Sequence, residues 1–193
     1  MRFFNLSLRP RLVWAALSGL LTYPVNVLDS ALGPDRYPPI LSWWLILHGL
    51  LFGALVMAPF VSRNDHRVWR VAALMLASVM IYYTAIEVPE LVKIAVLGDA
   101  GLYTTAGIIG AVLVAVATRF IAPLSVTPGF WVMSLLAGTI GGLLFSLTID
   151  ICPWDSCSAP WKILPFTSGW IVWQGLICTA MYLGLRRDDA SGP

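Results

Sequence analysis

Charged side chains are scarce in this sequence. Of its 193 residues, 11% are Asp, Glu, Lys or Arg, whereas 59% are hydrophobic. A soluble domain carries roughly 25% charged residues and about 45–50% apolar ones. No long polar stretch divides the chain. The composition therefore excludes an ordinary soluble domain and predicts one all-α integral membrane domain over residues 1–193.

The short motifs of common catalytic sites are also missing. The sequence contains no Gly-x-Ser-x-Gly, no His-Glu-x-x-His, no phosphate-binding glycine loop and no dinucleotide fingerprint. Its two histidines are His48, in an apolar segment, and His66, in a loop rich in arginine. At such different depths they cannot ligate one haem iron together. The sequence therefore disfavours an enzyme, and it predicts neither a cofactor nor a metal site.

Six apolar stretches approach the length of about 20 residues that a membrane-spanning helix needs. They predict a compact bundle of six transmembrane helices at 12–31, 40–60, 68–88, 102–122, 130–149 and 164–185. Arginines before the first stretch resemble the start of a signal peptide, but no convincing cleavage site follows, so we expect an uncleaved helix. Pro24 is expected to interrupt the first helix, and Pro89 to close the third.

The arginines and lysines of the short loops predict the orientation of the bundle. One side carries nine of them, against three on the other side, namely Arg36, Lys93 and Lys162. The nine are Arg2, Arg9, Arg11, Arg63, Arg67, Arg70, Arg119, Arg186 and Arg187. Because basic loops stay in the cytoplasm, both termini are predicted to be cytoplasmic, in a bacterial inner membrane.

Small residues at a spacing of four mark faces on which helices can approach closely. Such pairs occur at Gly49 and Gly53, at Gly138 and Gly142, and at Ala15 and Gly19. They serve either packing within the bundle or docking against another membrane subunit. In size and helix number the chain is similar to the small substrate-binding subunits of vitamin uptake transporters. That resemblance implies a docking role for the Ala15–Gly19 face.

Carboxylates gather at the predicted periplasmic end. Asp29, Glu87 and Asp150 each lie at the outer end of a different segment, and Asn26 lies beside the predicted break at Pro24. Acids near the hydrocarbon tend to face the bundle interior or a water-filled space. These residues either bind a cation or small ligand, or they are ordinary helix ends in the headgroup layer.

His48 is the second candidate ligand-binding site. A histidine inside a membrane segment must find a polar partner, and Trp44 one turn away suggests an aromatic surrounding. The alternative is a structural histidine bonded to a neighbouring helix. The third candidate is the pair Cys152 and Cys157, whose spacing permits a disulfide in the oxidising periplasm. That pair is either a structural disulfide or a redox-active one.

Three functions remain open at the level of sequence. The favoured one is a small carrier, or a membrane subunit of a transport complex, with its ligand site near the periplasmic end. The alternatives are a non-catalytic interaction protein, of the assembly or immunity type, and a thiol–quinone oxidoreductase. The expected partners are the lipid bilayer and either another membrane subunit or a second copy of the chain. Nucleic acid is not expected, because topology already explains the arginines.

Overall fold

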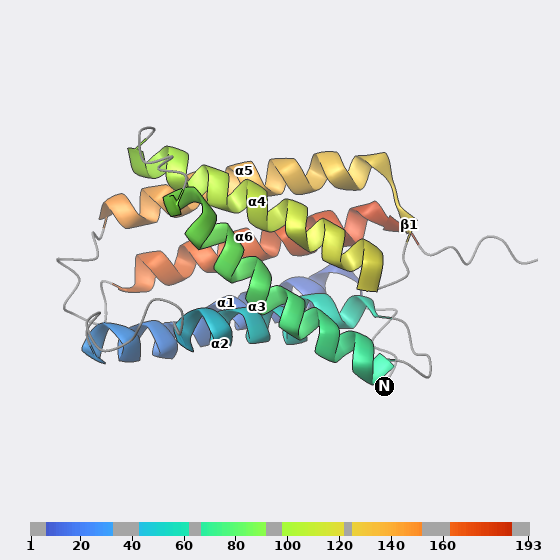
Figure 1. Cartoon of the computed structure of the whole chain (residues 1–193), viewed down its shortest axis with the longest axis horizontal. Helices are drawn as coiled ribbons and strands as arrows, with labels where there is room; N and C mark the ends of the chain where they lie inside the picture. Colours follow the sequence, from blue (N-terminus) through green and yellow to red (C-terminus); the bar gives the residue numbers. More distant parts are fainter. Residues whose placement is uncertain are drawn as a thin grey trace, which may run out of the picture.

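The computed structural model describes residues 7–32, 43–61, 67–91, 98–121, 125–151 and 163–186. Its main elements are long α-helices, shown in Figure 1. Their bounds are α1 Leu8–Leu32, α2 Trp43–Phe52, α3 Arg67–Leu91, α4 Gly98–Ile121, α5 Pro128–Ile151 and α6 Ile163–Gly184. Each predicted segment corresponds to one of these helices, and the predicted all-α class is confirmed.

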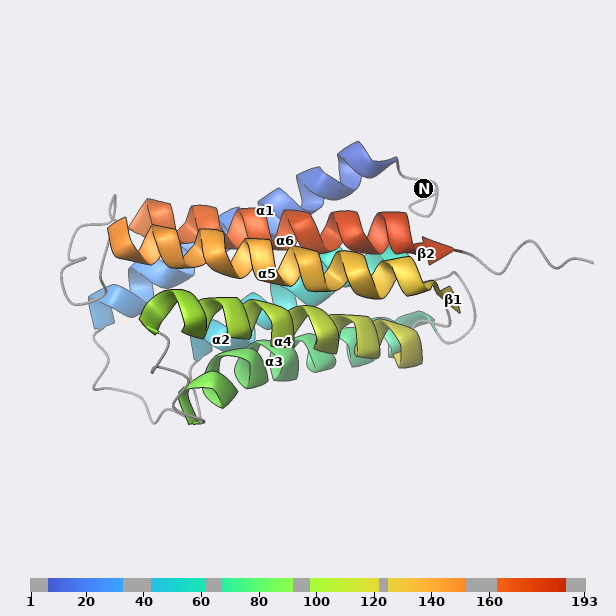
Figure 2. The ribbon, with the colours of Figure 1, turned by 90° about the horizontal axis from the view of Figure 1, so that it is seen from above.

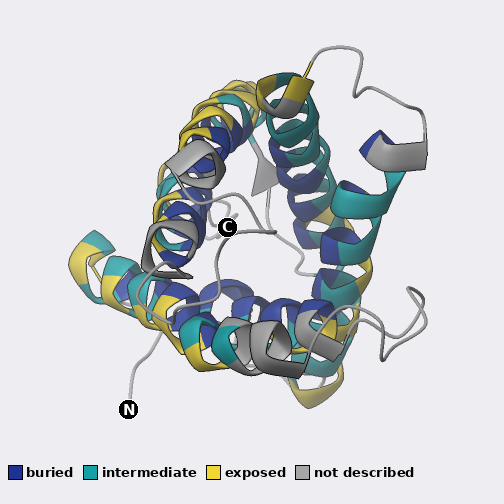
Figure 3. Ribbon diagram, turned by 90° about the vertical axis from the view of Figure 1, so that its left-hand side faces the viewer, coloured by how far each residue is buried: buried dark blue, intermediate teal, exposed yellow. Residues whose placement is uncertain are grey.

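Each helix packs against the next one in the chain, and α6 returns to pack against α1. The six helices therefore form a closed ring, which is seen end-on in Figure 3. In that view the buried faces point inward and the exposed faces point outward. From above, the helices run side by side along the long axis of the molecule (Figure 2).

Three helical stretches in the described residues are long and apolar enough to cross a membrane. They are Arg67–Pro89, Ala100–Ile121 and Pro128–Leu147, and the stretch Leu45–Phe60 is apolar but shorter. Together they indicate a membrane protein.

The effect expected of two prolines was wrong. Helix α1 continues through Pro24 as far as Leu32, and α3 continues through Pro89 as far as Leu91. A proline inside a helix removes one backbone hydrogen bond, and membrane helices tolerate that loss when other groups compensate. Each proline also lies in the last third of its helix, where most of the preceding turns are already formed.

Helix α2 changes its winding in the middle of its apolar segment. Gly53–Met57 forms a π-helical turn, in which the N–H of Ala58 donates to the carbonyl of Gly53, and Ala58–Phe60 follows as a 3-10 turn. The cause is Pro59, which has no N–H to donate and whose ring clashes with the carbonyl four residues earlier in a regular α-helix. Widening the turn relieves that clash. The helix predicted at 40–60 is therefore irregular over its last eight residues.

Helix α5 begins at a local capping signal. The Thr127 hydroxyl accepts a hydrogen bond from the N–H of Phe130 at 3.3 Å, and Pro128 occupies the first helical position. Just before it, the two-residue strand β1 (Ser125–Val126) pairs antiparallel with β2 (Leu185–Arg186), which follows α6. This small pair ties the α4–α5 connection to the chain after α6.

Small residues bring neighbouring helices into backbone contact. A Cβ added to Gly138 would lie 2.6 Å from the carbonyl oxygen of Gly107, and one added to Gly142 would meet the carbonyl of Tyr103. Only glycine fits this α4–α5 contact. In the same way Gly49 and Gly53 lie against the α3 backbone.

The Ala15–Gly19 face is likewise used within the bundle. Ala15 is fully buried, and a Cβ on Gly19 would lie 2.8 Å from the Cα of Ile171 on α6. This face is therefore covered by the chain's own last helix, and the docking role implied by the resemblance to vitamin uptake subunits does not apply to it.

The exterior of the bundle is apolar, unlike the surface of a soluble helical bundle. Exposed apolar side chains cover the outward face of α5, namely Val132, Leu135, Leu136, Ile140, Leu143, Leu144 and Leu147. Buried polar side chains lie on the inward faces, among them Ser18, Thr22, His48, Ser78, Thr167 and Gln174. An apolar exterior suits lipid, and buried polar groups between helices are typical of membrane bundles.

Candidate functional site

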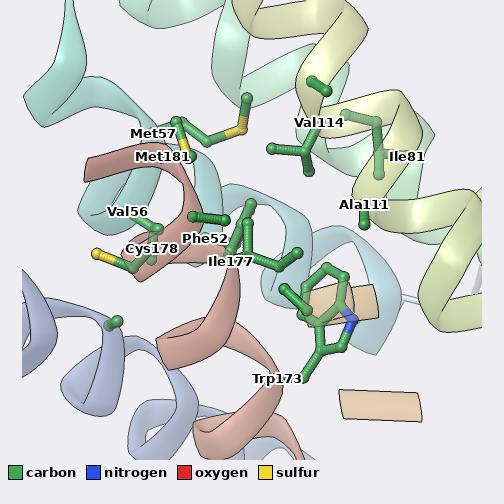
Figure 4. Close-up of a cluster of buried hydrophobic side chains, with 14 of the residues drawn as sticks. Phe52, Val56, Met57, Ile81, Ala111, Val114, Trp173, Ile177, Cys178 and Met181 are labelled. Atoms are coloured by element: carbon green, nitrogen blue, oxygen red, sulfur yellow. The ribbon is translucent and has the colours of Figure 1, made fainter. Parts of the chain in front are cut away.

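A cluster of side chains from three helices combines polar and aromatic groups in the interior. We call it the polar–aromatic cluster, and it consists of His48 and Phe52 on α2, Tyr82 on α3, and Trp170, Trp173 and Gln174 on α6. All six side chains are buried. Phe52 and Trp173 are seen in Figure 4, beside buried aliphatic side chains from α3, α4 and α6.

One hydrogen bond joins the cluster across the ring of helices. Gln174 Nε2 donates to Tyr82 Oη at 3.0 Å, which links α6 to α3 although these two helices are not neighbours in the ring. Within the described residues, the Gln174 Oε1 atom is buried and has no hydrogen-bond partner. An unpaired buried amide oxygen costs roughly 1–3 kcal/mol. The amide of Gln174 therefore offers an acceptor inside the bundle to any donor that can reach it.

Aromatic rings surround this hydrogen bond. Tyr82 stacks on Trp170, with ring centroids 5.1 Å apart and an interplanar angle of 19°. The ring centroids of His48 and Trp170 are also 5.1 Å apart, and their ring planes are tilted by 55°. Phe52 approaches both Tyr82 and Trp173, at 5.8 and 5.6 Å. These separations lie in the range of favourable ring pairs, each worth about 0.5–1.5 kcal/mol beyond burial. The rings hold Tyr82 and His48 in one orientation.

Trp173 is held in place by two glycines on neighbouring helices. A Cβ on Gly141 of α5 would lie 2.5 Å from the Trp173 Cδ1 atom, and one on Gly110 of α4 would lie 3.1 Å from its Cζ2 atom. The indole thus lies against α4 and α5 with one edge. It also contacts the ring of Phe52 at a tilt of 41° and the ring of Tyr82 in a T-shaped arrangement. Through this side chain the cluster is connected to the side of the ring opposite α1 and α2.

Of the two sequence-predicted site residues whose side chains the structure describes, His48 and Glu87, His48 belongs to the cluster. Its side chain is fully buried, and its aromatic neighbours are Trp170 and Tyr82 rather than Trp44, whose side chain lies outside the described part of the structure. Glu87 is half-buried on α3, five residues beyond Tyr82. Five residues rotate a helix by about 140°. Glu87 and Tyr82 therefore point to different sides of α3.

The remaining predicted site residues are not described. The side chains of Asn26, Asp29 and Asp150 lie outside the described part of the structure, as do Cys152 and Cys157. The predicted carboxylate site and the predicted disulfide are therefore untested. Among the described residues, no three His, Cys, Asp or Glu side chains come together to hold a metal ion, and Cys178 is buried as a free thiol.

Sequence reasoning missed Tyr82, Gln174 and the two tryptophans of α6. The usable signal was Gln174 itself, an amide in the middle of an apolar segment, directly after Trp173. A polar side chain inside a membrane helix needs a partner on another helix. The partner, Tyr82, gave no signal of its own, because tyrosine is common at membrane interfaces as well as inside bundles.

The Tyr82–Gln174 pair predicts a measurable coupling energy. Tyr82→Phe and Gln174→Leu are each expected to destabilise the bundle, and the double variant is expected to lose less than the sum of the two. Couplings of this kind in membranes reach about 0.6–1.7 kcal/mol. Unfolding of the four proteins in one detergent measures the coupling, and strict additivity would show that the two side chains do not interact.

No protein-family model matches this chain, and no curated protein or solved structure is significantly similar to it. The chemistry of the cluster is accordingly the main guide to function. It offers a histidine, a phenol and an amide, all without formal charge when the imidazole is neutral, between flat aromatic surfaces. Side chains of this kind can hold a ligand by hydrogen bonding and ring contact.

Proposed function

We propose that this protein is a bacterial inner-membrane carrier, or the membrane subunit of a transport complex, that binds a small ligand at the polar–aromatic cluster. In this proposal all six helices span the bilayer and both termini are cytoplasmic. Helices α1 and α6 contain 25 and 22 residues, which corresponds to about 33–38 Å at 1.5 Å per residue. That length is sufficient for a hydrocarbon core of about 30 Å.

The observation that carries the proposal is the convergence of His48, Tyr82 and Gln174 from three helices inside an apolar bundle. Polar groups in the membrane interior are costly, and they commonly mark a substrate path or ligand site. His48 lies five residues, or about 8 Å, from the Trp43 end of α2, whereas Gln174 lies near the middle of α6. In the proposed orientation the cluster therefore occupies the periplasmic half and extends to the midplane.

The charge of the cluster favours an uncharged ligand. The aromatic faces would stabilise a cation by about 0.5–2 kcal/mol. Removing an ion from water costs several kcal/mol, and no carboxylate belongs to the cluster to offset that cost. A neutral planar molecule with a hydrogen-bond donor for Gln174 Oε1 fits better. In this proposal Glu87, which is half-buried nearer the outer end of α3, lies where the ligand enters the bundle.

No specific observation favours either alternative function. The small-residue faces that motivated an interaction protein are occupied within the bundle, and the cysteine pair that motivated an oxidoreductase is not described.

The test is native mass spectrometry of the protein after mild extraction from its own host. A bound small molecule is expected on the wild type, and at least a tenfold lower occupancy is expected for Gln174→Leu, because the variant lacks the amide. Thr139→Val is the matched control, since Thr139 lies on α5 and donates to the Leu135 carbonyl of its own helix. A wild-type protein that carries no small molecule, or a ligand retained in Gln174→Leu, would contradict the proposal.

A further inference from the structure

The hydrogen bond between Gln174 and Tyr82 uses only part of the bonding capacity of the two side chains. In this bond Gln174 Nε2 donates to Tyr82 Oη at 3.0 Å. A phenol can accept and donate at the same time, and Tyr82 Oη has no second hydrogen-bond partner among the described residues. Gln174 Oε1, an acceptor, is buried and unpartnered within the same residues. The pair therefore presents one donor, the Tyr82 O–H, and one acceptor to a third group.

The remaining donor and acceptor lie close together, because one hydrogen bond joins the two side chains. From the lengths of an amide and of that bond, Gln174 Oε1 and Tyr82 Oη lie roughly 4–5 Å apart. One small ligand group can bridge this distance if it donates to Oε1 and accepts from the Tyr82 O–H. A cyclic secondary amide, or lactam, does so, because its N–H and its C=O point to the same side.

Other polar groups match this pair less well. An ether, an ester or a tertiary amide offers acceptors alone and would leave Gln174 Oε1 unpaired. A carboxylic acid is ionised at neutral pH, and no Lys or Arg belongs to the polar–aromatic cluster to offset its burial. A hydroxyl must donate and accept through one oxygen atom. A lactam uses two atoms, which lets both hydrogen bonds approach linearity.

The rings around Tyr82 favour a planar ligand. Trp170 stacks on the Tyr82 ring at 5.1 Å, while Phe52 and Trp173 approach the same ring at 5.8 and 5.9 Å in tilted and T-shaped arrangements. The phenol is thereby held among flat apolar surfaces. A conjugated ring gains contact with such surfaces, whereas a flexible chain loses rotational freedom when it binds.

We infer that the ligand of the polar–aromatic cluster is a neutral planar heterocycle with a lactam edge. Its N–H donates to Gln174 Oε1, and its C=O accepts from the Tyr82 O–H. Pyridones, quinolones and the lactam-containing nucleobases have this chemistry. The inference rests on the proposed function and adds to it the class of substrate.

The test compares planar probes of similar size on the wild-type protein in nanodiscs. The probes are 2-quinolone, N-methyl-2-quinolone, which lacks the N–H, and 2-naphthol, which carries a hydroxyl instead of the lactam. Isothermal titration calorimetry measures each dissociation constant, and titration of empty nanodiscs corrects for partition into lipid. We expect 2-quinolone to bind at least about tenfold more tightly than either other probe, because a buried acceptor left unpaired is costly.

Two variants assign the contacts to residues. Gln174→Leu is expected to remove the preference for 2-quinolone over its N-methyl derivative, to within about twofold, because the acceptor for the N–H is lost. Tyr82→Phe is expected to weaken both quinolones alike, since both keep the C=O. Thr139→Val, on the outward side of α5, is expected to keep the wild-type values.

Different results would overturn the lactam edge and the ligand site. Equal binding of the two quinolones by the wild type, equally tight binding of 2-naphthol, or a preference that persists in Gln174→Leu would overturn the lactam edge. If no probe binds while native mass spectrometry finds a small molecule on the protein, the substrate class alone is wrong. If neither experiment finds a ligand, the proposed function fails with it.

Discussion

Gly142→Ala is expected to destabilise the bundle by about 2–3 kcal/mol, because the added methyl group has no room between α5 and α4. The new Cβ would meet the carbonyl oxygen of Tyr103 and would lie 2.7 Å from the Cα of Thr104. Both are backbone atoms of α4, so no side chain can rotate away, and the α4–α5 pair must separate. The midpoint of thermal unfolding in a mild detergent, followed by tryptophan fluorescence, measures the loss.

Gly175→Ala is the matched control for this substitution. Gly175 also lies inside a helix, α6, but a Cβ built there has no atom of another described helix within 4 Å. Alanine is the better helix former by about 0.8–1 kcal/mol, so the control is expected to be neutral or slightly stabilising. Equal unfolding midpoints for the two variants would mean that α4 and α5 do not approach as closely as the structure has them.

Trp173→Ala is expected to cost about 3–5 kcal/mol, as for other large-to-small substitutions in packed interiors. The indole contacts rings of Phe52, Tyr82 and Trp170 and fills the space beside Gly110 and Gly141. Those two glycines lie on separate helices, α4 and α5, so loss of the indole leaves a cavity that side-chain movement at these positions cannot fill. Denaturant or thermal unfolding in detergent reports the loss.

Trp69→Ala is the control for Trp173→Ala, because it removes a tryptophan that is exposed instead of buried. Trp69 is 77% exposed, and its replacement is expected to cost less than about 1 kcal/mol. Trp173→Phe, which keeps an aromatic ring in the same place, is expected to fall between the two alanine variants. A Trp173→Ala protein as stable as Trp69→Ala would show that α6 does not pack against α4 and α5 through this side chain.

The sequence predicted the helices well because their signal is local. A run of apolar residues of the right length is visible in any window, so the segment predicted at 68–88 corresponds closely to Arg67–Leu91. The errors concern Pro24 and Pro89, where a local rule was applied too strictly. Proline removes one backbone bond, but a long membrane helix with many remaining bonds continues past it.

The candidate site was predicted only in part, because its geometry is not local. His48 was identified from its own position, but Tyr82 and Gln174 are 92 residues apart, and only the closed ring brings them together. The sequence likewise did not determine which helices the small residues bring together. Gly138 and Gly142 indicate a close approach of two helices, but the identity of the partner helix, α4, depends on the order of the helices around the ring.

The contact between α6 and α1 has a consequence for biogenesis. The helices leave the ribosome in chain order, so α1 has no neighbour on one side until the last helix is synthesised. That last helix also brings Trp170, Trp173 and Gln174, half of the polar–aromatic cluster. Until α6 packs, Tyr82 lacks its amide partner and Gly19 lies uncovered. A chain that stops before α6 would therefore form an open arc of five helices instead of a closed ring.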